Sequence, residues 1–577
     1  MTGASCNSHW ASALVDGLAA GGLVDAVISP GSRSTPLVLA VAQHPAVRVH
    51  TILDERTAGF FALGLARASG RMVALVCTSG SAGAHYLPAL VEASASHVPL
   101  VVMTADRPIE LQGCGAPQTI DQGGLFGVHV RNSFDLVAPS PGADSRWLRT
   151  LIARVVDAAQ GVLPGPVHLN VPFRKPLWSA ETAAPAARRP AARILRGPAV
   201  ASPASMQALA DRIRGVERGV FVCGPSPPER AKVGDRESSI YSLAEHLGWP
   251  VLAEPASQLR FSRWVNGSVI SSAQALLSGA AADLEPELVV QIGQAPTSKS
   301  VAQWVARHGE GRLVLIDGCG VWRDPTHNAD LLVVGEVGWV CRELRASLDE
   351  GAGTWLDTWR SAEEAAQRVL AEACGDGLWE GAVARALVGE MPEGSFLHVA
   401  SSMPIRDLDT FAPSATTTVS VMANRGANGI DGTIATALGE ASAWGEGLGA
   451  LLMGDLAFLH DAGSLIGVEA DLTIVVLNNG GGGIFGFLPI KDHPDAFEPH
   501  FLTPQRAGIA ALCEAAGVRH TEVKDMAQFV QDFREELLRS GVGILEVVID
   551  REENISRHHA AWEAVDVAFK LAMRGEG

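Results

Sequence analysis

The stretches Met453-Gly454-Asp455-Leu456 and Leu477-Asn478-Asn479-Gly480-Gly481 decide the fold. Each follows a short apolar run, Ala450–Met453 and Leu472–Leu477, of the length and composition typical of a buried strand. The segment between them has helical spacing, so the pair predicts two parallel strands joined by a crossover helix. Neighbouring parallel strands end at the same edge of a sheet, where ligands bind. We therefore expect Asp455 and Asn479 to lie side by side at that edge.

The residue types at this edge suit a divalent cation beside a phosphate. A carboxylate, an amide oxygen and a backbone carbonyl are hard oxygen ligands, which Mg²⁺ accepts together with phosphate oxygens and water. Glycines allow the backbone to approach phosphates closely. Taken singly, each stretch has an ordinary alternative, a helix-capping aspartate and a glycine-rich turn. Their combination favours the metal site.

The same alternation of apolar runs and helical patterns extends over the whole chain. It predicts an α/β protein with three Rossmann-like parallel-sheet domains at 1–180, 205–352 and 353–577, joined after the first by an Ala-, Pro- and Arg-rich linker at 181–204. The predicted strands are Asp25–Ser29, Val47–Leu53, Met72–Cys77, Pro99–Thr104, Gly219–Cys223, Pro250–Ala253, Leu288–Ile292, Leu313–Ile316, Leu331–Val334, Phe396–Ala400, Thr417–Met422, Ala450–Met453, Leu472–Leu477 and Ile544–Ile549.

Composition limits the class of protein. Hydrophobic residues make up 47% of the 577 residues and charged residues 19%, which is typical of globular domains with large cores. A formal charge of −18 argues against nucleic acid or an anionic membrane as the main partner. We see neither an apolar run long enough to span a membrane nor a secretion signal. The eight cysteines form no CxxC pair, so we expect no zinc site or disulfide framework, and a cytoplasmic setting.

Gly454-Asp455 followed by Asn478-Asn479, within three α/β domains, resembles the cofactor-binding motif of thiamine diphosphate-dependent enzymes. The resemblance implies a pyrimidine-binding, a central and a diphosphate-binding domain, in that order. It also implies that Asp455, Asn479 and the carbonyl of Gly481 hold Mg²⁺, with Mn²⁺ as the alternative. The implied cofactor-binding residues are Glu55, Ser79, Gly80, Gly454, Asp455, Leu456, Asn479, Gly481, Ile484 and Phe485.

Glu55 is the implied catalytic residue. It follows the predicted strand Val47–Leu53 and precedes the apolar helical segment Ala58–Ala68. A carboxyl group in that place would share a proton with the aminopyrimidine ring and so activate the cofactor. From the residues alone, the alternative is a surface glutamate that the helix dipole favours.

A longer series of motifs narrows the resemblance to the family of 2-succinyl-5-enolpyruvyl-6-hydroxy-3-cyclohexene-1-carboxylate synthases of menaquinone biosynthesis. The motifs are Ser29–Pro36, Asp54–Arg56, Thr78–Ala82, Thr104–Pro108, Gln118–Gln122, Asn424–Gly432 and Gly483–Pro489. The resemblance implies decarboxylation of 2-oxoglutarate and 1,4-addition of the succinyl carbanion to isochorismate. The match covers both terminal domains, and the central domain matches weakly.

Both implied substrates are dianions, so the site needs local positive charge despite the acidic total. Guanidinium groups bind carboxylates through two parallel hydrogen bonds. The implied substrate residues are Ser32, Arg33, Arg107, Gln118, Lys299, Ser402, Arg406, Arg425, Ile484, Phe485 and Leu488. The sequence departs from the family at Ser300, where a second basic residue commonly follows the lysine. Arg307 is a candidate replacement.

Three other interpretations remain open at this point. An acetolactate synthase-like enzyme or 2-oxo acid decarboxylase would share Glu55, Asp455 and Asn479 but would not need the arginines. A nicotinamide- or flavin-binding oxidoreductase would carry a dinucleotide fingerprint, which we do not find. A non-catalytic binding protein would retain the fold with a misplaced Glu55 or Asp455. The resemblance also implies a homo-oligomer, a dimer or a tetramer, with active sites at the subunit interface.

Overall fold

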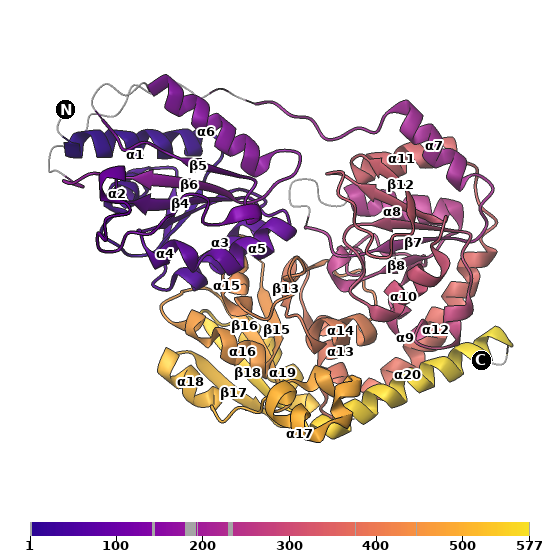
Figure 1. Cartoon of the computed structure of the whole chain (residues 1–577). Helices are drawn as coiled ribbons and strands as arrows, with labels where there is room; N and C mark the ends of the chain where they lie inside the picture. Colours follow the sequence, from indigo (N-terminus) through magenta and orange to yellow (C-terminus); the bar gives the residue numbers. More distant parts are fainter. Residues whose placement is uncertain are drawn as a thin grey trace. The chain divides into compact units, whose positions relative to one another are not determined.

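The computed structural model describes residues 3–140, 145–178, 192, 194–228, 235–375, 377–445 and 447–575 (Figure 1). These residues form three six-stranded sheets in which every neighbouring pair of strands is parallel, with helices between the strands. The predicted fold class, α/β with three Rossmann-like sheets, is confirmed. No described helix is both long and apolar enough to cross a membrane.

The first sheet has the order β2-β1-β3-β4-β6-β5. Its strands are β1 (Asp25–Ile28), β2 (Arg48–Thr51), β3 (Val73–Cys77), β4 (Leu100–Asp106), β5 (Asn132–Asp135) and β6 (Val167–Pro172). The helices of this part are α1 (Gly3–Ala20), α2 (Thr35–Gln43), α3 (Glu55–Ser69), α4 (Ser81–Ala84), α5 (Leu87–Ala95) and α6 (Ser145–Gln160). Strand β3 is buried at every position, which explains its continuous apolar run.

The second sheet has the order β12-β11-β10-β7-β8-β9. Its strands are β7 (Gly219–Cys223), β8 (Val251–Ala253), β9 (Val269–Ile270), β10 (Leu288–Ile292), β11 (Leu313–Asp317) and β12 (Ala329–Val334). The helices are α7 (Pro203–Ile213), α8 (Asp235–Leu247), α9 (Ala273–Leu276), α10 (Lys299–His308), α11 (Val337–Ser347) and α12 (Thr354–Cys374).

The third sheet has the order β14-β13-β15-β16-β18-β17. Its strands are β13 (Ser395–Val399), β14 (Val419–Met422), β15 (Gly449–Gly454), β16 (Leu472–Asn478), β17 (Arg519–Val523) and β18 (Val542–Val548). The helices are α13 (Glu380–Glu390), α14 (Met403–Phe411), α15 (Thr433–Trp444), α16 (Asp455–Asp461), α17 (Pro494–Phe497), α18 (Ile509–Ala516), α19 (Met526–Leu537) and α20 (Arg551–Met573). Helix α20 packs along α12 through a shared apolar core (Figure 1).

The chain divides into two compact units that do not follow the three sheets. The first contains Met1–Arg196 with Asn424–Gly445 and His460–Asp471, and the second contains Gly197–Ala423, Glu446–Leu459 and Leu472–Gly577. Helix α15 therefore belongs with the first sheet, where it packs on α3. The domain boundaries drawn from the sequence remain a prediction, and much of the linker at 181–204 lies outside the described residues.

All the predicted strands are present, and four more were not predicted. Strands β5, β9 and β17 are short strands at sheet edges. Edge strands of this kind have a weak apolar pattern. Strand β6 lies between β4 and β5 and is buried throughout, but His168 and Asn170 interrupt its apolar run.

Candidate cofactor and substrate site

Asp455 and the turn after β16 lie together at one edge of the third sheet. Strands β15 and β16 are neighbours, with Gly454 opposite Leu477. Asp455 is 6% exposed, and its carboxylate accepts hydrogen bonds from the backbone N–H groups of Leu456 and Gly481. Asn479 is the first residue after β16 and precedes Gly481 by two positions, so it belongs to the same turn. The expected pairing of the two strands is confirmed, and the roles of Asp455 and Asn479 stay a prediction.

Burial raises the pKa of Asp455 to about 6, against the opposing effect of the backbone N–H groups of Leu456, Gly481 and Asp455 itself. The protein alone therefore stabilises this carboxylate incompletely. A divalent cation beside the carboxylate would favour its ionised form strongly, as metal ions do for their ligands.

Asn479 has one amide end occupied and the other without a partner. Its Nδ2 donates to Glu380 Oε1 over 2.6 Å. Its Oδ1 is buried and accepts no hydrogen bond from the residues that the structure describes. Buried amide oxygens nearly always accept a hydrogen bond or bind a cation, so we expect a partner for this oxygen. A hard cation at this oxygen would supply one, and the carboxylate and amide oxygens present are ligand types that fit Mg²⁺.

The segment after this turn is tightly built. Gly481 has φ 141°, and a Cβ there would lie 2.3 Å from the carbonyl oxygen of Leu502, so only glycine fits. The following 3₁₀ helix, Gly483–Phe487, carries Ile484 and Phe485, both half-buried. The Phe485 ring packs edge-on against Phe501 at 5.4 Å between centroids. Leu488, just past the helix, is exposed.

Glu55 is the first residue of α3, in the other compact unit. The preceding Asp54 caps the helix by accepting from the N–H groups of Arg56 and Thr57. Glu55 is half-buried, and its charge acts on two fully buried side chains, Cys77 and Tyr86. Burial raises the pKa of Cys77 and of Tyr86, and the charge of Glu55 raises each further. Glu55 thus lies at a helix start beside an apolar interior, and its catalytic role stays a prediction.

Ser79, Arg107 and Gln118 form one hydrogen-bonded group in the same unit, and Gly80 follows Ser79 in the chain. Arg107 donates to Ser79 Oγ and, over 3.4 Å, to Gln118 Oε1. Gln118 in turn donates from Nε2 to Ser79 O over 3.0 Å. Gly80 has φ 89°, and its N–H donates to Gln122 Oε1 over 2.9 Å. The structure therefore brings two predicted cofactor residues and two predicted substrate residues together.

Arg33 adds a second guanidinium group to this region. It is 6% exposed, and its Nη1 donates to Phe173 O over 2.7 Å. Burial lowers the pKa of Arg33, and the nearby charge of Arg107 lowers it further, against the opposing effect of Asp106. The neighbouring Ser32 is exposed. Two cationic groups in mutual range are suited to an anionic ligand.

Arg425 lies in a loop that the first compact unit holds by its backbone. Glu92 is 3% exposed, and its carboxylate accepts from the N–H groups of Gly426 and Ala427 over 3.0 and 2.7 Å. Arg67 pairs with both Glu92 and Glu440. This buried network fixes the loop beside the predicted arginine.

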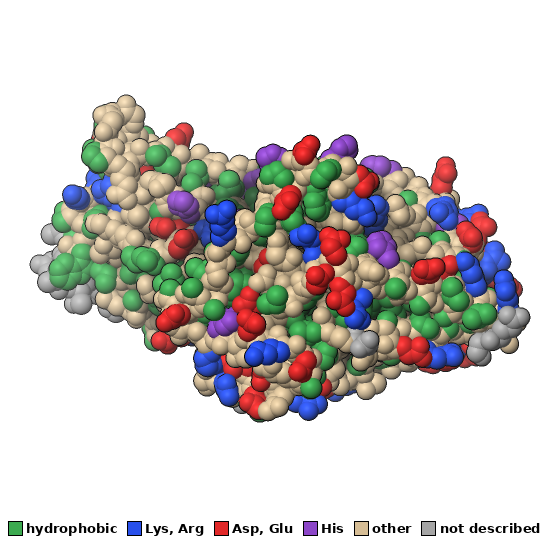
Figure 2. Space-filling model, turned by 90° about the horizontal axis from the view of Figure 1, so that it is seen from below, with side chains coloured by type: hydrophobic (Ala, Val, Ile, Leu, Met, Phe, Trp, Pro, Cys, Tyr) green, Lys and Arg blue, Asp and Glu red, His purple; other side chains and the backbone are tan. Residues whose placement is uncertain are grey.

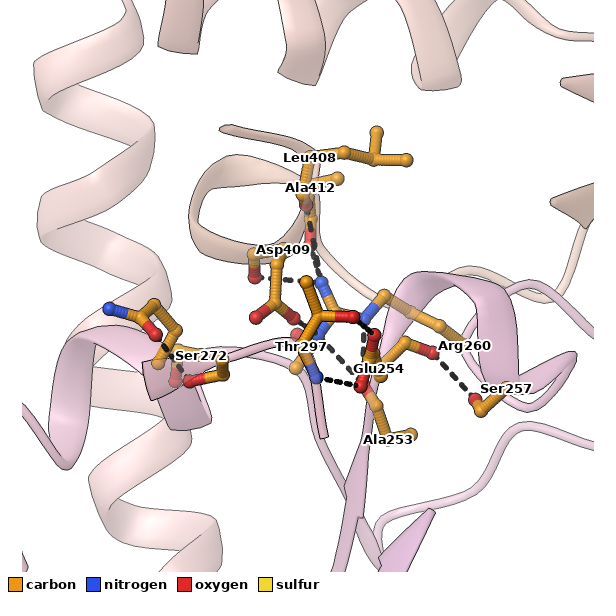
Figure 3. Close-up of polar contacts among 12 residues, drawn as sticks. Ala253, Glu254, Ser257, Arg260, Ser272, Thr297, Leu408, Asp409 and Ala412 are labelled. Atoms are coloured by element: carbon orange, nitrogen blue, oxygen red, sulfur yellow. Dashed lines mark hydrogen bonds and ion pairs between the residues drawn. The ribbon is translucent and has the colours of Figure 1, made fainter. Parts of the chain in front are cut away.

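Ser402 and Arg406 lie in the second unit near the buried carboxylate of Glu254. Glu254 accepts from the N–H and the hydroxyl group of Thr297, two residues before Lys299 (Figure 3). Arg406 donates to Ser402 O over 2.5 Å. Burial lowers the pKa of Arg406, and the charges of Asp407, Asp409 and Glu254 oppose that effect. Lys299 is exposed at the first position of α10.

Arg260 anchors α14, which carries Arg406. It is 1% exposed, pairs with Asp409 at 2.8 Å, and donates to the carbonyl oxygens of Leu408 and Ala253 (Figure 3). A buried charge needs this number of partners to offset its lost hydration.

At the position where the family carries a second basic residue, Ser300 makes a hydroxyl network instead. Gln274 donates to Ser300 Oγ over 3.2 Å, and Ser278 Oγ lies 2.8 Å away. Arg307 is near the opposite end of α10, where it pairs with Asp283. The structure does not bring Arg307 to Ser300.

Sequence reasoning missed the buried carboxylates that support these groups, namely Glu92, Glu254 and Glu380. Each stands within or beside an apolar run, which is unusual for a charged residue and is the one signal the sequence offered. Their partners come from remote segments, so only the structure identifies them.

Comparison with known proteins agrees with this geometry. Residues 9–125 match the family model described as thiamine pyrophosphate enzyme, N-terminal TPP binding domain, and residues 198–399 match one described as middle domain of thiamine pyrophosphate. The chain is 43% identical to a protein of Geobacillus kaustophilus, over 97% of this chain and 98% of the relative. It is 41% identical to one of Myxococcus xanthus (100% and 99%) and 39% identical to one of Chloroflexus aurantiacus (98% and 97%). All three bear the name 2-succinyl-5-enolpyruvyl-6-hydroxy-3-cyclohexene-1-carboxylate synthase.

Proposed function

Because the chain belongs to the family of 2-succinyl-5-enolpyruvyl-6-hydroxy-3-cyclohexene-1-carboxylate synthases, we propose that it decarboxylates 2-oxoglutarate and adds the succinyl group to isochorismate. The products are CO₂ and the compound that gives the family its name, in menaquinone biosynthesis. It is a transferase that uses thiamine diphosphate, in the cytoplasm. The observation that carries this proposal is the full-length similarity together with Asp455 and Asn479 at adjacent strand ends.

Thiamine diphosphate, when bound, supplies an electron sink for the decarboxylation and the transfer. Glu55 would hold a proton at a ring nitrogen of its aminopyrimidine. The placement at the start of α3, beside the buried Cys77 and Tyr86, supports that role. Ser79 and Gly80 would line the same part of the site.

Asp455, Asn479 Oδ1 and the carbonyl of Gly481 would hold Mg²⁺, or Mn²⁺, against the diphosphate. Gly454 and Leu456 flank this group. No atom lies within 4 Å of a Cβ added at Gly454, which leaves room for a phosphate. Ile484, Phe485 and Leu488 would exclude water, because a proton from solvent would divert the reaction.

The carboxylates of the two substrates would bind to the arginine groups of each unit. Arg33, Arg107 and Gln118 form one such group with Ser32 near it, and Ser402 and Arg406 form another, with Lys299 as a further candidate in the same unit. Arg425, held by the Glu92 network, is the remaining candidate. Arginine forks fix the orientation of a carboxylate as well as its charge.

A coupled assay tests the proposal. The protein receives thiamine diphosphate, Mg²⁺ and 2-oxoglutarate, with and without isochorismate, whose loss is followed by ultraviolet absorbance. Turnover of pyruvate but not of 2-oxoglutarate would instead indicate an acetolactate synthase-like or 2-oxo acid decarboxylase activity.

Glu55→Gln tests the catalytic assignment in the same assay. We expect at least about a hundredfold loss of kcat, the usual contribution of a proton-transfer group, while thiamine diphosphate still binds. Normal turnover by this variant would show that Glu55 does not act on the cofactor.

We also propose that the active unit is a homo-oligomer with sites at the subunit interface. Light scattering of the purified protein gives its mass directly. An active monomer would refute this assembly.

A further inference from the structure

Glu380 lies directly behind the amide of Asn479. It is the first residue of α13 and is 1% exposed. Its Oε1 accepts from Asn479 Nδ2 over 2.6 Å, and its Oε2 accepts from Asn554 Nδ2 over 2.8 Å. Asn554 Oδ1 accepts from the backbone N–H of Glu380. Each carboxylate oxygen thus receives one amide group.

An asparagine amide has two ends of nearly equal size, and only hydrogen bonds decide which way it turns. Rotation of the Asn479 amide by 180° would bring Oδ1 against Oε1 of the ionised Glu380, which has no proton to donate. The carboxylate therefore fixes the Nδ2 end inward. Oδ1 is left at the other end, buried and without a hydrogen-bond partner among the described residues.

Glu380 also lies near Asp407 and His558, whose aromatic neighbours include Phe487 of the 3₁₀ helix in the candidate site. His558 bonds to Asp407 Oδ1 at 2.9 Å, and a carboxylate oxygen of Asp407 lies within 4.8 Å of one of Glu380. The rings of Trp379, Phe411 and Phe487 lie between 5.1 and 5.2 Å from His558, centroid to centroid. Phe487 ends the 3₁₀ helix that carries Ile484 and Phe485.

Glu380, Asp407 and His558 could by type bind a metal, since their ligand atoms lie within 4.8 Å of one another. Glu380 bonds to the two asparagines, and His558 bonds to Asp407 and to the carbonyl of Asn554, which accounts for the cluster as a support. We propose that Glu380 is a positioning residue that turns Asn479 Oδ1 toward the divalent cation. This inference rests on the proposed function, in which Asn479 is a metal ligand.

The test measures thiamine diphosphate binding by calorimetry over a series of Mg²⁺ concentrations. Glu380→Met removes both acceptors at similar volume, and we expect the Mg²⁺ concentration for half-maximal binding to rise about tenfold or more. Glu380→Gln keeps one acceptor oxygen and should stay within about threefold of wild type. Glu363→Met is the matched control, because this α12 carboxylate instead holds Ser271 and Ser272.

Melting followed by circular dichroism shows whether each variant folds. Should Glu380→Met not fold, Glu380→Asp serves instead, because its shorter side chain draws the acceptor away from Asn479. Unchanged half-saturation in Glu380→Met, or in Glu380→Asp where it replaces that variant, overturns the inference. An equal rise of the half-saturating Mg²⁺ concentration in Glu380→Met and Glu380→Gln also overturns the inference. The effect would then not depend on the acceptor oxygen that only Glu380→Gln keeps. Binding that needs no Mg²⁺ in the wild type would refute the metal site itself, a separate result.

Discussion

At the scale of single residues, the candidate site depends on polar groups that the protein buries without full compensation. Asn479 Oδ1 is buried and unpaired among the described atoms, and burial raises the pKa of Asp455 to about 6. Such groups cost folding free energy unless a ligand satisfies them. Their presence at two adjacent strand ends is the physical argument for a cation there.

Another buried residue gives a pH dependence that can be measured. His168 is fully buried between Thr104 Oγ1, at 2.8 Å, and Ser133 Oγ, at 3.1 Å, and burial lowers its pKa to about 4. The unfolded chain, with a histidine pKa of about 6.5, binds more protons below that pH. The contribution of His168 to stability is therefore complete above about 6.5 and is lost as the pH falls toward 4, roughly 3 kcal/mol in all.

We expect His168→Gln to remove this dependence, because glutamine does not titrate. Urea unfolding of both proteins at pH 7 and pH 5 gives the comparison. Between these two values the wild type should lose about 2 kcal/mol more than the variant. Equal losses would mean that His168 is not buried in its neutral form.

At the scale of elements, the close crossing of α3 and α15 joins the Glu55 helix to a segment more than 350 residues later in the sequence. A Cβ at Gly64 would lie 2.0 Å from the carbonyl oxygen of Thr436, and one at Gly439 would lie 2.0 Å from that of Phe61. Glycine at both positions lets the two backbones touch. The helical pattern of each segment was visible in the sequence, but their pairing was not.

Gly64→Ala should therefore destabilise the protein by at least about 2 kcal/mol, because the methyl group meets backbone that cannot move aside. Gly389→Ala is the control, since Gly389 is exposed in α13 with no atom within 4 Å of an added Cβ. It should be neutral or stabilising by up to about 1 kcal/mol. Thermal unfolding distinguishes the two, and similar melting temperatures would contradict the crossing.

The sequence predicted the central strands of each sheet more reliably than the strands at the sheet edges. Strands with continuous apolar runs, such as β3 and β16, were predicted because burial on both faces imposes that composition. Strand β17, Arg519–Val523, lies at a sheet edge and is largely polar, so it gave no such pattern.

At the scale of the whole molecule, the formal charge is −18. On the face in Figure 2, acidic and basic side chains alternate over the surface. The positive groups proposed to bind the substrates are Arg33 with Arg107 in the first unit and Arg406 in the second. Arg33 is buried and Arg406 is half-buried. The net negative charge, taken alone, would have argued against anionic substrates.

Cofactor binding should stabilise the molecule as a whole. Thiamine diphosphate at about a hundred times its Kd, with Mg²⁺, adds about 2.7 kcal/mol to the folded state and raises the melting temperature. Excess EDTA should abolish that shift, because the diphosphate then lacks its cation. An equal shift with and without EDTA would show that the metal takes no part in binding.

The sequence by itself determined the α/β class, the strand ends that carry Asp455 and Asn479, and the family, because these depend on local apolar runs and short motifs. Only the tertiary structure decided that Glu380 holds Asn479, that Glu92 holds the loop at Gly426, and that α15 packs on α3. The physical reason is that each of these contacts depends on a partner from a remote segment of the chain. Such a partner produces no repeating pattern in the local sequence.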